Sequence, residues 1–262
     1  MKKFTILAFI ISCCICSIHA QDNSNNNTGN NSKLGGLKLG KKDAIVMNFY
    51  TDIWQKNDSS MSIRNYSPGF DIYLMKDITF GKSKFSFGYG LGISVHNMHS
   101  DAVPKNEMKW DSATSQNVFT GKTIFSRIPD YVNNNEIKYD NNKLTLTYIE
   151  IPLELRYKKE NKRGKMFKFS VGGKAGYLLS SYTKYKGTKY EGSSSDPDVG
   201  VAKIKIKNYN ISNLQSLSYG VTMRVGYGLC NIFGYYSLSK IFKKDKGPEM
   251  YPISVGISIT PF

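Results

Sequence analysis

The chain has 262 residues, enough for one barrel or one or two ordinary domains, and its formal net charge at pH 7 is +16. Three of its four cysteines lie within the first 16 residues, so Cys230 alone would remain in a processed chain. This excludes an intramolecular disulfide and a cysteine-based metal site there.

The first 20 residues are typical of a secretory signal peptide. Lys2 and Lys3 precede an apolar run over 4–18, and Ala20 is a small residue at a plausible cleavage point. The alternative is a lipidation box at 10–13, which would leave an apolar remnant on the mature chain. Cleavage lowers the charge to +14. Because an exported chain rarely meets nucleic acid, we expect this charge to attract anionic lipid head groups instead.

Residues 21–42 are rich in Asn, Gly and Ser and predict a disordered polar leader. No later segment is apolar for long enough to cross a bilayer as a helix. If the protein lies in a membrane, strands must cross it. Eight segments alternate between apolar and polar or small residues, which is typical of strands: 43–54, 68–76, 84–95, 143–157, 166–181, 216–228, 232–241 and 252–260.

The third segment, KFSFGYGLGISV, shows the pattern most clearly. Large apolar residues occupy every second position from Phe85 to Val95, and glycine or serine fills the positions between them. Its glycines do not have the spacing of a dinucleotide-binding loop. An apolar face toward lipid explains the large residues, and a face toward a crowded lumen explains the glycines and serines. In the seventh segment, the weakest, we expect Tyr236 and Leu238 to face outward.

The connections predict how the strands are arranged. Those at 77–83, 158–165 and 229–231 are short, whereas those at 55–67, 97–142, 182–215 and 242–251 are long. Short and long connections alternate, as the periplasmic turns and external loops of outer-membrane barrels do. The sequence therefore predicts an all-β protein: an eight-stranded antiparallel up-and-down transmembrane β-barrel over 43–262.

The lumen-facing phase contains both acids and bases. An eight-stranded barrel is only wide enough for side chains to fill, and buried charges must be paired. We therefore expect a salt-bridged plug, with Arg224 and Lys174 near Glu150 and Glu154; the alternative places some of these charges at a wet rim. The predicted cluster is Asp71, Glu150, Glu154, Arg156, Lys168, Lys174 and Arg224.

Four segments resemble the PorT-like outer-membrane β-barrel family of Gram-negative bacteria: residues 69–97, 146–158 (LTYIEIPLELRYK), 172–184 and 219–242. The resemblance covers about 43–262 and implies an eight-stranded outer-membrane barrel. Its founding member is associated with type IX protein secretion. Phe262 resembles the terminal residue that the barrel assembly machinery recognises, although 253–259 are out of phase with it unless Pro261 introduces a bulge.

Three functions follow as hypotheses. The first is a non-enzymatic scaffold or binding module that acts through loops 97–142 and 182–215, with 182–190 contacting lipid or lipopolysaccharide phosphates or remaining solvated. The second is a component of a secretion system. The third is a lipid A-modifying enzyme using His96 or His99, but Ser94 and His96 fall in the lumen phase, away from lipid. We expect no catalytic residue, no metal, no cofactor and no nucleic-acid partner.

Overall fold

The computed structural model describes residues 33–34, 37–38, 43–56, 61–81, 83–113, 115–132, 138–161, 166–189 and 198–260. The predicted signal peptide, most of the predicted leader, and Phe262 lie outside these residues. The chain divides into two units, Met1–Lys41 and Lys42–Phe262. In the first unit, β1 (Lys33–Leu34) pairs antiparallel with β2 (Leu37–Lys38).

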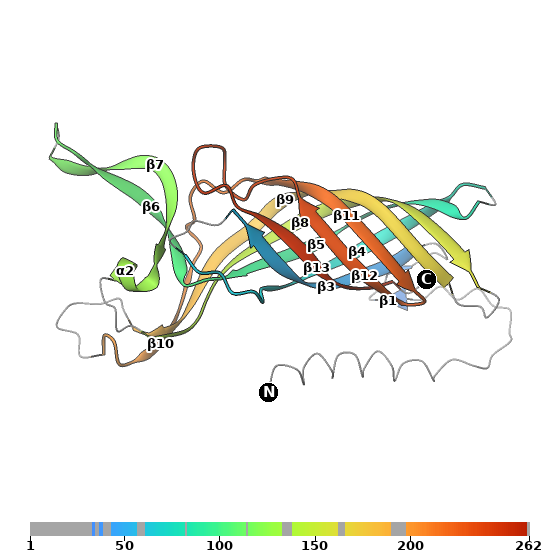
Figure 1. Ribbon diagram of the computed structural model, residues 1–262, viewed down its shortest axis with the longest axis horizontal. Coiled ribbons are helices and arrows are strands. Elements are labelled where there is room, and N and C mark those ends of the chain that lie inside the picture. The colour runs from blue at the N-terminus through green and yellow to red at the C-terminus, as the bar shows by residue number, and fades with distance from the viewer. Residues whose placement is uncertain are drawn as a thin grey trace. The chain divides into compact units, whose positions relative to one another are not determined.

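The second unit contains a closed ring of eight antiparallel strands in its described residues (Figure 1). Each barrel strand pairs with the next one along the chain, and β13 closes the ring by pairing with β3, where Ile253 lies opposite Ile53. The predicted eight-stranded barrel is therefore confirmed. Its strands are β3 (Asp43–Gln55), β4 (Pro68–Thr79), β5 (Phe85–His99), β8 (Tyr139–Glu160), β9 (Met166–Thr188), β11 (Leu217–Tyr227), β12 (Cys230–Ser237) and β13 (Tyr251–Ile259).

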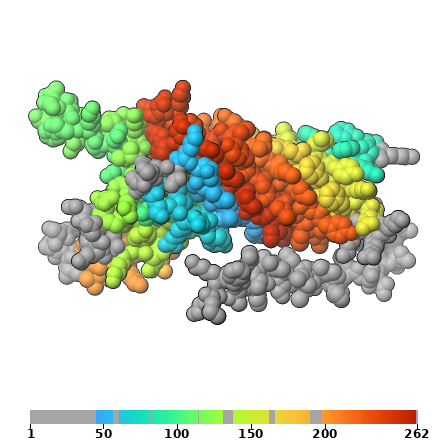
Figure 2. Space-filling view, in the orientation of Figure 1, coloured from blue at the N-terminus to red at the C-terminus, as the bar shows by residue number. Residues whose placement is uncertain are grey.

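The two faces of the wall differ as the alternation predicts. Phe49 of β3, Leu91 of β5 and Val221 of β11 are each about half exposed on the outside. Figure 2 shows strands β11 to β13, in orange and red, packed side by side into a continuous surface. Polar and charged residues point inward from the same strands. Tyr236 and Leu238 are exposed whereas Tyr235 is buried, as expected.

One charged residue lies on the outer face of β4. Lys76 is exposed between Leu74 and Ile78 and is paired in register with Tyr89. It stands near the short-turn end of the strand, where a long lysine side chain can extend to the head groups.

The turns are tighter than expected and some strands are longer. Tyr227 pairs directly with Cys230, so Gly228 and Leu229 form a two-residue hairpin turn. Gly228 has a positive φ of 67°, as such turns require at their first position. β8 and β9 have 22 and 23 residues and extend beyond their predicted bounds at the long-loop end. β12 instead stops at Ser237, because the chain then turns inward and buries Ile241 and Phe242.

The long loops contain structure that the sequence pattern did not predict. β6 (Ala102–Asp111) and β7 (Gln116–Arg127) form a separate two-stranded sheet, which the short helix α2 (Ile128–Val132) follows (Figure 1). β10 (Lys203–Asn208) pairs with the extended end of β9. The sequence pattern assigned 97–142 and 182–215 to long connections, whereas the structure places β6, β7 and β10 there. No helix in the described ranges is long and apolar enough to cross a membrane.

Candidate functional site

All seven residues of the predicted ion cluster lie inside the ring and are buried. They come from four strands: β4 supplies Asp71; β8 supplies Glu150, Glu154 and Arg156; β9 supplies Lys168 and Lys174; and β11 supplies Arg224. None of their side chains lies at a wet rim, since each residue is at most 8% exposed. The structure groups them into two layers along the lumen.

Lys174 is at the centre of the first layer. Its Nζ lies 2.9 Å from Glu150 Oε2 and 3.6 Å from Asp71 Oδ2, so one ammonium group bridges carboxylates from β8 and β4. Tyr73 donates a hydrogen bond to the same Glu150 oxygen at 2.5 Å. The Lys174 ammonium also lies 4.1 Å from the centre of the Tyr235 ring, a cation–π distance. The charge of Lys174 is thus compensated on several sides.

Asp71 accepts three neutral hydrogen bonds as well. Asn48 donates at 3.0 Å, the Tyr50 hydroxyl at 2.7 Å and the Ser94 hydroxyl at 2.6 Å. A buried carboxylate needs such partners because removal from water costs several kcal/mol. These donors link β4 to its two neighbours in the ring, β3 and β5.

Ser94, His96 and Asp52 form a hydrogen-bonded chain beside this layer. His96 Nδ1 donates to Asp52 Oδ2 at 3.0 Å, and Ser94 Oγ lies 3.1 Å from His96 Nε2. Serine hydrolases use the same three residue types in the same order. Here, however, Ser94 has its single hydroxyl proton directed to Asp71, and Ser254 donates to Asp52 at 2.6 Å. All members of the chain are buried.

The hydrogen-bonded residues Ser94, His96 and Asp52 have no space beside them for a substrate. A cavity of about 10 Å³ borders His96, Tyr148 and Ser237. That volume holds one water molecule at most. The arrangement of Ser94, His96 and Asp52 therefore fits a structural hydrogen-bond network better than a hydrolytic site.

Arg156 organises the second layer, toward the short turns. Its Nη1 lies 2.5 Å from Asp77 Oδ1 and its Nε donates to Glu154 at 3.0 Å. Arg224 also forms an ion pair with Glu154. Lys158 reaches Asp77 at 2.5 Å, and Lys168 donates to the Thr260 carbonyl at 3.3 Å. The sequence pattern missed Asp77 and Lys158, because both fall in segments that it assigned to turns.

The pairs expected from the sequence are present in these layers. Lys174 contacts Glu150, and Arg224 contacts Glu154. In the described residues, five lumen carboxylates (Asp52, Asp71, Asp77, Glu150 and Glu154) face five lumen lysines and arginines (Arg156, Lys158, Lys168, Lys174 and Arg224). The near balance of charge is what a filled, low-dielectric interior requires.

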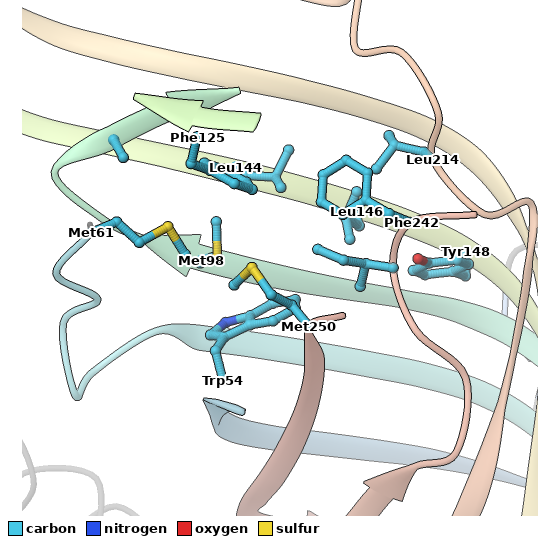
Figure 3. Packing of buried hydrophobic residues seen from close by; sticks show 12 residues of the cluster. Trp54, Met61, Met98, Phe125, Leu144, Leu146, Tyr148, Leu214, Phe242 and Met250 are labelled. Carbon is cyan, nitrogen blue, oxygen red and sulfur yellow. The ribbon is translucent and has the colours of Figure 1, made fainter. Parts of the chain in front are cut away.

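An apolar cluster lies at the long-loop end of the barrel, where its side chains pack together (Figure 3). Trp54, Met98 and Leu146 rise from barrel strands, and Phe242 and Met250 come from the loop between β12 and β13. Met61, Phe125 and Leu214 add side chains from the other long connections or their strands. The sequence pattern could not find this cluster because its remaining members, such as Phe242 and Met250, lie in long connections without periodicity.

Comparison with known proteins supports the assignment of the fold. The family described as outer membrane protein beta-barrel domain matches residues 19–243 of the chain. Neither a curated protein nor a solved structure matches the chain.

Proposed function

Because the chain belongs to the outer membrane protein β-barrel domain family, we propose that it is a non-enzymatic scaffold or binding module with a closed lumen. The observation that carries this proposal is the filling of the interior. Two ionic layers occupy the ring and an apolar cluster packs at its long-loop end. The cavities beside Arg224 and His96 measure about 20 and 10 Å³, too small for a continuous water path, whereas a cavity of about 390 Å³ lies beside Lys158 at the short-turn end.

Conductance tests the closed lumen. The full processed chain is incorporated into planar lipid bilayers, and we expect no porin-like current steps. Flotation of the same preparation with lipid vesicles establishes that the protein has inserted. Regular steps of ion-sized conductance from the unaltered protein would overturn the proposal.

The long connections are the surface on which a binding module of this kind would act. Loops carry binding residues more often than the framework that positions them. In this protein they include the separate β6–β7 sheet and the β8–β9–β10 extension. Pull-down from native outer membranes identifies a partner of the β6–β7 sheet when the full chain is compared with a chain that lacks residues 103–126. Identical recovery with both chains counts against that sheet as the binding element.

A role in secretion is the alternative that the PorT-like resemblance implies. It predicts that the protein co-purifies stoichiometrically with a large envelope complex. The same pull-down separates the two, since a scaffold with loop-mediated binding loses its partner when the loop is removed. The cavity of about 10 Å³ beside His96 does not favour the lipid A-modifying enzyme.

A further inference from the structure

A β-bulge reverses the faces of β9 at the edge of the membrane wall. Tyr148 of β8 pairs with Leu178, but its neighbour Thr147 pairs with Ser180, so Leu179 is an extra residue on β9. Before the bulge, even-numbered residues such as Lys174 point into the lumen. Beyond it, odd-numbered Tyr185 is buried and even-numbered Lys186 is exposed. The bulge therefore turns Lys184 and Lys186 to the outside.

Six lysines share this outer face on three neighbouring strands. Lys184 lies opposite Lys143 of β8 on one side and opposite Lys207 of β10 on the other. In the next row Lys186 lies opposite Lys205. Directly opposed residues point to the same side of a sheet. We call this surface the lysine face: Lys143, Lys184, Lys186, Lys203, Lys205 and Lys207.

The other side of the same strands is apolar. Ile204 and Ile206 of β10 pack with Tyr185 against Ile128 of α2. This packing fixes the orientation of β10, so its lysines cannot rotate inward. The alternating sequence of β10, KIKIKN, is thus explained by two faces with different neighbours.

Like charges on directly opposed residues destabilise a sheet. In the described part of the chain, three lysines of this face contact other groups. Lys186 lies 3.7 Å from Asp140, Lys207 lies 5.1 Å from the Tyr182 ring centre, and Lys143 donates to Asn97 at 2.9 Å. Lys143 stands beyond the bulge, outside the membrane-spanning segments. Burial lowers its pKa, and neighbouring Lys184 and Lys207 lower it further, although Tyr182 opposes the shift. A bound polyanion would relieve this repulsion.

The lysine face lies directly above the lipid-facing wall. Tyr177 and Leu179, the last wall residues of β9, are both 55% exposed. With a rise of about 3.3 Å per residue and a strand tilt of about 40°, Lys184 stands roughly 13 Å above Leu179 along the membrane normal. The head-group layer occupies about 5–8 Å on each side of a bilayer, and lysine side chains can extend back toward it. Tyr182 and Tyr209, whose ring centres are 5.6 Å apart, lie beside the lysines.

We propose that the lysine face binds the phosphate groups of a phosphorylated glycolipid in the outer leaflet. The inference rests on the proposed function only in placing the long-loop end outside the cell. Continuity of the lysine face with the lipid-facing wall favours a lipid over a soluble acidic polymer. Its two rows of lysines match a ligand that has more than one phosphate group.

Lipid retention tests the proposal. The full processed chain in detergent is mixed with bisphosphorylated lipid A, with dephosphorylated lipid A, or with inorganic phosphate, and bound molecules are counted by native mass spectrometry. We expect at least tenfold tighter binding of bisphosphorylated lipid A than of the dephosphorylated form, with the difference shrinking at high salt. Inorganic phosphate is expected to compete only at much higher concentration.

Variants assign the binding to the lysine face. Replacement of Lys184, Lys205 and Lys207 by Gln should remove most of the preference for phosphate. A matched control, with Lys243, Lys244 and Lys246 replaced by Gln, removes the same charge from another long loop and should keep the preference. Equal loss in both variants, or an unchanged preference in the first, would overturn the proposal. So would tighter binding of a soluble acidic polysaccharide than of bisphosphorylated lipid A.

The outcome is independent of the closed lumen. Circular dichroism and protease resistance establish that each variant is folded. Conductance of the same preparations is expected to remain absent in the lysine-face variant. An open pore with intact lipid preference contradicts the proposed function alone, and a closed pore without lipid preference contradicts the lysine face alone.

Discussion

Lys174 on β9 forms an ion pair with Glu150 on β8, with Nζ 2.9 Å from Oε2 in the middle of the lumen. Both side chains are at most 2% exposed. The pair has no access to solvent that could screen a charge left behind. Its two members therefore depend on each other, and on Asp71, for compensation.

We expect Lys174→Met to lower the free energy of unfolding by about 3–5 kcal/mol, because it leaves buried carboxylates without their cation. Urea unfolding of the protein in lipid vesicles measures the change. The double variant Lys174→Met, Glu150→Gln should recover part of the loss, since one uncompensated charge is removed. As a control, Lys240→Met breaks an exposed pair with Glu249 and should have no measurable effect. If Lys174→Met behaves like this control, the ionic layer does not stabilise the barrel.

The second prediction concerns Gly88 of β5. A Cβ atom at Gly88 would lie 2.7 Å from both Cζ and Nε of Arg156. Gly88→Val should displace Arg156 from Asp77 and Glu154 and destabilise the protein by about 1–3 kcal/mol, as overpacking usually does. Urea unfolding again supplies the measurement.

Gly234 of β12 is the matched control, because a Cβ atom there would meet no atom within 4 Å. We expect Gly234→Val to change the free energy of unfolding by no more than about 0.5 kcal/mol. Equal stability of Gly88→Val and the unaltered protein would mean that Arg156 is not held where the structure places it.

Alternation determines most of what the sequence predicts about the barrel. Strand side chains alternate with period two, so Leu91 and Gly88 of β5 could be placed on opposite faces without knowing any partner strand. A bulge breaks that rule and has no sequence signature in SSYTK after Leu179. The extension of β9 was therefore missed, and so was the pairing of Lys184 and Lys186 with lysines of β8 and β10, although phosphate contact by 182–190 was one hypothesis. Residues 182–190 were expected to be a loop, whereas β9 continues to Thr188.

The lumen illustrates a different limit. Alternation assigns Asp71 and Lys174 to the interior, but their contact joins β4 to β9 across the ring. Which residues meet across a lumen depends on the stagger of the strands after closure. Neighbour pairing cannot supply that. For the same reason the contact between Asp52 of β3 and His96 of β5 could not be predicted.

The third prediction is that Ser94 is chemically inert. Its hydroxyl donates to Asp71 and it lies in a packed interior, so neither an activated nucleophile nor an open path to it exists. A fluorophosphonate probe should not label the folded protein. His96→Gln should leave lipid A acylation in cells unchanged and should instead lower the stability of the barrel. Stoichiometric labelling at Ser94, or altered acylation with His96→Gln, would restore the enzyme hypothesis.

The last prediction uses His99, which ends β5 beyond the lipid-facing wall and is paired in register with Lys143. Burial lowers its pKa to about 4, and Lys143 and Arg64 act in the same direction. The folded pKa is thus below the unfolded value of about 6.5. Between these values the unfolded chain binds more protons, so the stability contributed by neutral His99 is complete above pH 6.5 and declines as the pH falls toward 4.

His99→Gln should remove this contribution, so the unfolding free energy of the unaltered protein should fall more steeply than that of the variant between pH 6.5 and 4. Urea unfolding at several pH values in this window measures the difference, and groups common to both chains cancel. Bound phosphate close to Lys143 would also raise the pKa of His99, because a nearby anion favours the imidazolium form. NMR titration of the His99 ring should therefore show a higher pKa with bisphosphorylated lipid A than with the dephosphorylated lipid. Parallel stability curves would refute the depressed pKa, whereas an unchanged titration would place the bound phosphate away from this end of the lysine face.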